Sequence, residues 1–148
     1  MNYRISYSNP HDHFITIEFV AETRTADFIH VQLPAWRPGR YELGNFAKNV
    51  RKWTASDANG KALSFSKTTK DCWKVSCKGI EQVYIRYEYF AAELNAGSTF
   101  LDENQLYMNP VNCCAYIEGR VDEPCTLALH VPENYLIACS LPKAGETP

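Results

Sequence analysis

Gln82-Val83-Tyr84-Ile85-Arg86-Tyr87-Glu88-Tyr89-Phe90 is the stretch of sequence that decides the fold. Apolar and polar side chains alternate along it, which is the period of a β-strand with one buried and one solvent-facing side. One face carries Val83, Ile85, Tyr87 and Tyr89, and the other carries Gln82, Tyr84, Arg86 and Glu88. The stretch therefore predicts a half-buried strand.

Shorter runs of strand character recur on both sides of this stretch, at 13–20, 28–33, 63–66, 72–77, 113–118, 125–131 and 136–139. Turn signals such as Asn59-Gly60 and Glu123-Pro124 separate them. One short helix is expected at 43–50, where apolar residues recur at helical spacing. We predict an all-β fold, an antiparallel β-sandwich with at most one or two short helices.

Length and charge limit the classes of function. The 148 residues are enough for one domain, which we place at residues 1–141, with 142–148 as the start of a linker or a truncated end. The net charge is −2 and no basic run occurs, so we expect no nucleic-acid partner. No apolar run of about 18 residues occurs and the alternating start lacks a signal-peptide core, so we expect no membrane partner and a cytoplasmic location.

The six cysteines stand at 72, 77, 113, 114, 125 and 139. Their spacings do not repeat the close pairs of a structural zinc site, and no secretory context favours disulfides. Free, mostly buried thiols are the favoured interpretation, and a metal or disulfide framework is the alternative.

Catalytic motifs are missing from the sequence. The four histidines precede Asp12, Phe14, Val31 and Val131, so none begins the H-E-x-x-H pattern of a zinc hydrolase. A G-x-S-x-G elbow, a P-loop and a G-x-G-x-x-G loop are also missing. We predict no catalytic residue, no metal site and no cofactor within this chain.

Three weaker groups of residues could carry chemistry. His11-Asp12-His13 could hold a metal, although a solvated loop is the favoured interpretation. Asp102-Glu103 pairs two carboxylates, although a turn is favoured. Exposed Tyr and Trp side chains could form a sugar-binding platform, although sandwich packing accounts for most of them.

A stiff loop, Leu33-Pro34-Ala35-Trp36-Arg37-Pro38-Gly39-Arg40-Tyr41, follows the predicted strand 28–33. Two prolines restrict it, and Pro38-Gly39 favours a turn with glycine at positive φ. We expect the loop to pack the Trp36 indole like a core aromatic and to present Arg37 and Arg40 at the surface. A structural role is favoured, and contact with substrate or another domain is the alternative, with Trp36, Arg37, Pro38, Gly39, Arg40 and Tyr41 as candidates.

The same loop carries a family resemblance. Leu-Pro-Ala-Trp-x-Pro-Gly-x-Tyr, followed by Asn45-Phe46-Ala47-Lys48-Asn49-Val50, resembles the N-terminal domain of the glycyl aminopeptidase family. Further similarity at 13–17, 58–63, 72–75, 83–87, 99–102, 109–110 and 118–119 extends the resemblance over nearly the whole chain.

The resemblance implies that this chain is an N-terminal β-sandwich of a larger zinc metallopeptidase. A thermolysin-like catalytic domain holding zinc on H-E-x-x-H and then a PDZ domain would follow it. The implied work of this domain is to pack on the catalytic domain and wall one side of the substrate cleft. The alternative is a free-standing carbohydrate- or peptide-binding sandwich.

Overall fold

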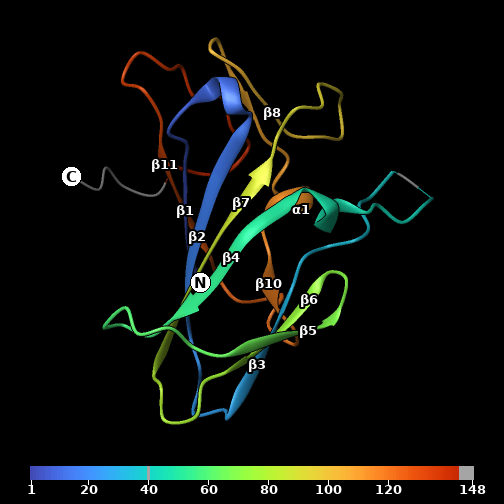
Figure 1. Ribbon diagram of the computed structural model, residues 1–148. Helices are drawn as coiled ribbons and strands as arrows, with labels where there is room; N and C mark the ends of the chain where they lie inside the picture. The colour runs from blue at the N-terminus through green and yellow to red at the C-terminus, as the bar shows by residue number, and fades with distance from the viewer. Residues whose placement is uncertain (40, 144–148) are drawn as a thin grey trace.

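The computed structural model describes residues 1–39 and 41–143, and Figure 1 shows two packed β-sheets with a small hairpin at one end. In chain order the elements are β1 (Asn2–Ser6), η1 (Pro10–Asp12), β2 (Phe14–Glu22), β3 (Phe28–Gln32), η2 (Phe46–Asn49), β4 (Val50–Ser56), β5 (Phe65–Thr69), β6 (Cys72–Ser76), β7 (Gln82–Phe90), β8 (Phe100–Leu101), β9 (Leu106–Tyr107), α1 (Pro110–Cys113), β10 (Tyr116–Ile117) and β11 (Thr126–His130). The predicted all-β sandwich is confirmed.

The larger sheet has the order β11-β1-β2-β7-β4. Its centre is the antiparallel pair β2 and β7, which stay in register over nine residues from Phe14 opposite Phe90 to Glu22 opposite Gln82. Both strands alternate buried and less buried positions, as the sequence of β7 predicted. The pairing of β1 with β11 is parallel, which the purely antiparallel prediction did not include.

The smaller sheet has the order β10-β3-β6-β5, and β8 pairs with β9 in a separate hairpin. The two larger sheets face each other across a continuous apolar core. The inner face of the larger sheet supplies Ile15, Ile17, Phe19, Val83, Ile85, Tyr87 and Tyr89, and the smaller sheet supplies Ile29, Val31, Trp73 and Val75. All of these side chains are at most 6% exposed, so the chain encloses its core with its own strands.

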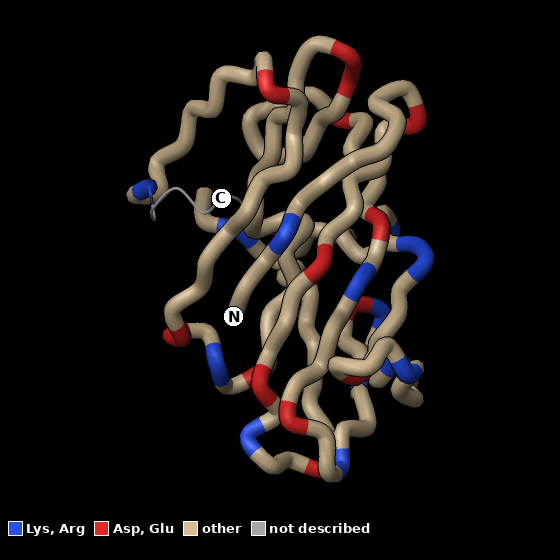
Figure 2. The backbone as a smooth tube through the Cα atoms, turned by 90° about the vertical axis from the view of Figure 1, so that its left-hand side faces the viewer, with Lys and Arg blue, Asp and Glu red and all other residues tan. Residues whose placement is uncertain are grey.

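The outer face of the larger sheet is a ladder of opposite charges. Arg86 Nη1 lies 3.0 Å from Glu18 Oε1, and Arg51 Nε lies 2.6 Å from Glu88 Oε2. Figure 2 shows these alternating acidic and basic positions along neighbouring strands. Such a face is well hydrated and does not need a covering partner.

Three of the elements expected from the sequence differ from the structure. The helix expected at 43–50 is a 3₁₀ turn at 46–49, and residue 50 already begins β4, a strand that the sequence did not reveal. Residues 136–139 form no strand. Cys113, which was expected to begin a strand, instead ends the short helix α1. Residues 142 and 143 have no regular structure, and 144–148 of the predicted linker lie outside the described residues.

Within the described part of the chain, no helix has the length and hydropathy needed to cross a bilayer.

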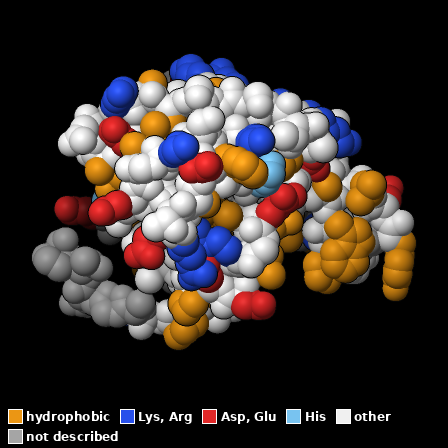
Figure 3. All heavy atoms as spheres, turned by 90° about the horizontal axis from the view of Figure 1, so that it is seen from below, with side chains coloured by type: hydrophobic (Ala, Val, Ile, Leu, Met, Phe, Trp, Pro, Cys, Tyr) orange, Lys and Arg blue, Asp and Glu red, His pale blue; other side chains and the backbone are white. Residues whose placement is uncertain are grey.

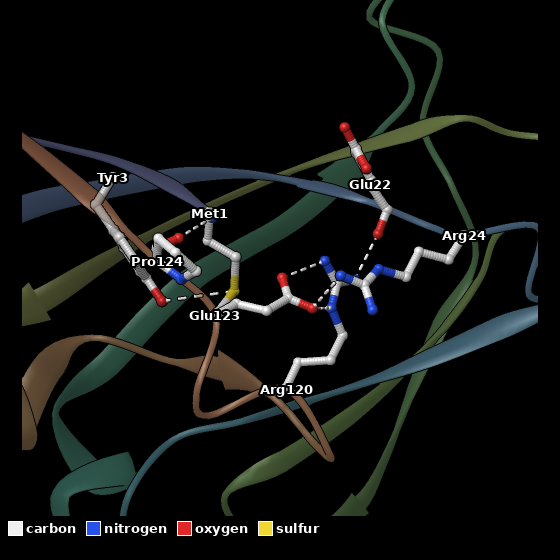
Figure 4. Close-up of polar contacts among 7 residues, drawn as sticks. All are labelled: Met1, Tyr3, Glu22, Arg24, Arg120, Glu123 and Pro124. Carbon is white, nitrogen blue, oxygen red and sulfur yellow. Dashed lines mark hydrogen bonds and ion pairs between the residues drawn. The ribbon is translucent and has the colours of Figure 1, made fainter.

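A polar cluster ties the chain start to the segment before β11 (Figure 4). Arg120 binds Glu123 with both ends of its fork, at 2.5 and 2.7 Å, and its Nη1 donates to the Glu22 carbonyl oxygen at 2.5 Å. Arg24 Nη2 lies 2.8 Å from Glu123 Oε1. The Met1 amino group donates to the Pro124 carbonyl oxygen at 2.9 Å. The cluster therefore holds the β2–β3 turn and the path into β11 together.

Replacing Tyr87 by Phe tests the core. The Tyr87 hydroxyl donates to the Cys113 carbonyl oxygen at 2.6 Å and accepts from the Ala115 N–H at 2.9 Å, and all three groups are buried. Removing the hydroxyl leaves both backbone groups unsatisfied, so Tyr87→Phe should lower the free energy of unfolding by about 1–3 kcal/mol. Urea denaturation measures this, with Tyr84→Phe on the outer face as the control, which should cost less than about 0.5 kcal/mol. Equal effects of the two variants would contradict this account.

Acid should weaken the Glu123 cluster. Hydrogen bonding from Arg120 holds the pKa of Glu123 below its ordinary value of 4.5, and the charges of Arg120 and Arg24 act in the same direction. A carboxyl whose pKa is lowered on folding stabilises the protein above its unfolded pKa, and that contribution disappears as pH falls through the folded pKa. Glu123→Gln should therefore cost stability at neutral pH and cost progressively less below pH 4.5. Urea denaturation of both proteins across this range measures the difference, and a difference independent of pH would refute the role of the charge.

Candidate functional site

The stiff loop leaves the smaller sheet at the end of β3 and returns at η2. Its start is fixed by Leu33, which is fully buried and whose N–H donates to the Asp71 carbonyl oxygen at 2.8 Å. Its return is fixed by Gly44, whose N–H donates to the Ala35 carbonyl oxygen at 2.6 Å. Gly39 has φ of 83°, as expected for the Pro38-Gly39 turn. A backbone hydrogen bond therefore joins the two ends of the loop.

The loop exposes its large apolar side chains, contrary to the expectation that it packs Trp36. Trp36 is 51% exposed, Leu43 is 76% exposed and Tyr41 is fully exposed. Figure 3 shows hydrophobic side chains gathered on a projecting edge at the right, where Figure 1 draws this loop. The reason is position, because Figure 1 shows the loop projecting to the side of the two sheets near the start of β4. We call Trp36, Tyr41 and Leu43 the apolar tip.

Arg37 lies inward, although a surface position was expected. It is partly buried, and its Nε is buried with no hydrogen-bond partner. Its guanidinium group packs against Gly97, so closely that a Cβ atom at position 97 would overlap it. Arg37 therefore connects the loop to the 91–99 segment. Pro38 and Gly39 are exposed beside it. The remaining candidate, Arg40, lies outside the described residues.

A pocket of about 410 Å³ opens beside the loop. Its wall is formed by Glu42, Leu43, Gly44 and Asn45 at the loop's end, by η2, by the end of β7 and by residues 97–99 and 112. Residues far apart in sequence thus meet at one end of the sandwich. Sequence reasoning missed Gly97 and Asn112, because a small residue in a turn and one polar residue near a proline carry no signal of their own.

Two of the weaker candidate groups hold neighbouring backbone in place through His13 and Asp102. His13 ends the turn η1, and its Nδ1 lies 2.6 Å from the Leu101 carbonyl oxygen, so its ring is engaged in holding β8. Asp102 accepts from the N–H groups of Asn104 and Gln105, which is the predicted turn. No group of three or more His, Cys, Asp or Glu residues suited to a metal occurs in 1–39 and 41–143.

The cysteines are free, and three of the six are buried, at 72, 77 and 113. Burial raises the pKa of the thiols of Cys72 and Cys77, which makes them poor nucleophiles at neutral pH.

The positions of the other two tryptophans, Trp53 and Trp73, agree with sandwich packing. Trp53 stacks on Trp73 with an interplanar angle of 2° and a centroid distance of 5.4 Å.

The Peptidase M61 N-terminal domain family matches residues 2–148. The chain belongs to this family. The sequence-based resemblance to the N-terminal domain of a glycyl aminopeptidase-like protein is thereby confirmed. The chain is the domain that stands at the N-terminus in proteins of a peptidase family.

The M61 N-terminal domain also has a solved structural neighbour. It is similar to the crystal structure of an aminopeptidase N family protein from Idiomarina loihiensis, with a TM-score of 0.82 and 30% sequence identity. The match covers 89% of this chain and 22% of that chain, so the domain spans about a fifth of its neighbour's length. A comparison with curated proteins finds no match.

The contact between Arg37 and Gly97 should restrict the loop of the M61 N-terminal domain. Gly97 does not have the positive φ that disfavours a side chain, so Gly97→Ala should act by displacing the movable end of Arg37. Both Gly97→Ala and Arg37→Ala should speed amide hydrogen exchange at 36–43 by about fivefold, or about 1 kcal/mol of local opening free energy. Arg86→Ala on the outer sheet face is the control. Wild-type exchange rates in both loop variants would show that the contact does not hold the loop.

Proposed function

We propose that this chain is a non-catalytic domain of a glycyl aminopeptidase-like zinc metallopeptidase. In this proposal a separate part of the parent protein carries the zinc ion and its H-E-x-x-H ligands, and a PDZ domain and a cytoplasmic location complete the parent. The family membership supports a peptidase context. The lengths also support it, because the match leaves most of the neighbour's chain for other domains.

The apolar tip is the observation that carries the proposal of docking. Three large apolar side chains project together from a loop that is closed at its base and packed through Arg37. Fully covering an exposed side chain such as Leu43 contributes about 1.5–3 kcal/mol. A loop that is already ordered loses little further conformational freedom on binding. We therefore propose that the tip packs on the catalytic domain. The surface around the pocket would then form one side of the substrate cleft, and a peptide substrate would bind in that cleft.

A free-standing carbohydrate- or peptide-binding module remains the second candidate, favoured by the exposure of Trp36 and Tyr41. Aromatic faces of this kind also stack on sugars. The two candidates differ in what covers the tip, because a docked tip is protected by the parent protein itself without any added ligand.

Removing the two most exposed side chains of the apolar tip should impair the parent enzyme without unfolding this domain. The double variant Tyr41→Ala/Leu43→Ala should leave the isolated domain's stability within about 0.5 kcal/mol, because both side chains are exposed. In the full-length protein it should lower kcat/KM on glycyl and alanyl arylamides by about tenfold or more, as for a central interface contact. Amides 36–43 should also exchange more slowly in the full-length wild type than in the isolated domain.

The matched control is Tyr84→Ala, which removes a partly exposed tyrosine from the charged outer face. It should change neither turnover nor exchange at 36–43. Unchanged turnover in the double variant, together with equal exchange in isolated and full-length protein, would exclude docking through the tip. Protection of the tip only on adding an oligosaccharide would favour the second candidate.

A further inference from the structure

One residue in the wall of the pocket beside the loop has a buried oxygen with no hydrogen-bond partner. Asn112, in α1, is 1% exposed and is part of the pocket wall. Its Nδ2 donates to the Gly97 carbonyl oxygen. Because only the amide nitrogen can donate, this contact identifies the nitrogen and oxygen ends of the side chain. Its Oδ1 is then left buried and unpaired. A buried carbonyl oxygen without a donor is costly, so one in a pocket wall indicates a missing group.

Three donors of the pocket wall are engaged with other groups, and the Thr99 hydroxyl in the same wall is buried with no partner, so it does not bond to Asn112. Asn49 Nδ2 donates to the Tyr89 hydroxyl at 3.1 Å, and Ser98 Oγ donates to Glu93 Oε2 at 3.2 Å. Lys48 Nζ lies 3.8 Å from Glu93 Oε1 at the rim. None of these donors bonds to Asn112 Oδ1, so the group that complements it must donate a hydrogen bond, as an N–H group does. A carboxylate or an ether would leave the same oxygen unpaired.

We propose that this pocket receives an N–H-donating side-chain group, an ammonium or a carboxamide, from the peptidase part of the parent protein. The inference rests on the proposed docking of the apolar tip. Leu43 belongs both to that tip and to the pocket wall, so one partner surface covers both. A docked surface also removes any water from the pocket mouth, so it must supply the donor itself or leave Asn112 Oδ1 unpaired under the interface.

The first test asks whether the isolated domain, which encloses its own core, selects N–H donors. Methylammonium chloride and acetamide are titrated to about 0.1 M, because very small ligands bind no more tightly than the millimolar range. We expect saturable shifts of the Asn112 side-chain and Gly97 backbone NMR signals with at least one of the two probes. Tetramethylammonium, a cation without N–H groups, should produce none. No saturable shift with either donor, or equal shifts with tetramethylammonium, would overturn the inference.

A plugged pocket provides the matched variant. Asn45 lines the pocket, is exposed and makes no side-chain hydrogen bond to cap η2, so Asn45→Trp should fill the mouth without breaking a contact. Asn59→Trp places the same bulk in the turn at the opposite end of β4. We expect Asn45→Trp to abolish the probe shifts and Asn59→Trp to preserve them. Shifts that survive Asn45→Trp would show that the probes bind elsewhere and would refute the site.

The full-length parent identifies the source of the donor. If its own side chain fills the pocket, methylammonium and acetamide should no longer shift the Asn112 signals, and Asn45→Trp should lower turnover. Probe binding to the full-length protein as strong as to the isolated domain would refute an occupant from the parent. Failure of docking is recognised separately, because it would leave the amides of 36–43 unprotected whatever the probes do.

Discussion

The pairing of β2 with β7 is the interaction on which the rest of the structure depends. Its nine-residue register places the buried residues of both strands on one side, and the other strands of the larger sheet pair outward from it. A shift by one residue would turn Ile17 and Tyr87 to solvent and expose charged residues to the core. Tyr87 also extends this constraint beyond the sheet, because its hydroxyl bonds to both sides of the backbone at 113–115. The position of α1, and with it Asn112, therefore follows from the register of β7.

Strict alternation made this part of the fold predictable from sequence. The strands β2, β3, β6, β7 and β11 all lie within or next to segments identified by their period. The strand β4 could not be identified in this way because its pairing with β7 shifts between Arg51 and Thr54, and Lys52 has φ of 50°. The irregularity breaks the alternation and lets Trp53 stack on Trp73 across the sandwich. Only the neighbouring strands, which the local sequence does not contain, determine such a bulge.

The loop shows the same division between local and tertiary information. Its prolines and glycine predicted stiffness and a turn, and Gly39 has the expected positive φ. Which side chain lies inside was predicted wrongly for Trp36 and Arg37, since an indole is usually packed and a guanidinium usually hydrated. In this protein no strand covers Trp36, whereas Gly97 offers Arg37 a surface without a side chain. Burial in a loop depends on distant segments, so local composition cannot assign it.

The docking proposal rests on a difference between two parts of the surface, one charged and one apolar. The broad outer face of the larger sheet carries opposite charges that pair with one another, as in Arg86 with Glu18, so it gains little from being covered. The end of the sandwich carries three uncovered apolar side chains beside a pocket with an unpaired carbonyl oxygen. The three apolar side chains lie outside the core that β2 and β7 organise. Exposed apolar side chains are costly in water, and a buried carbonyl oxygen is costly without a donor. The proposed partner surface would relieve both costs at the end where the loop, η2 and the 97–99 segment meet.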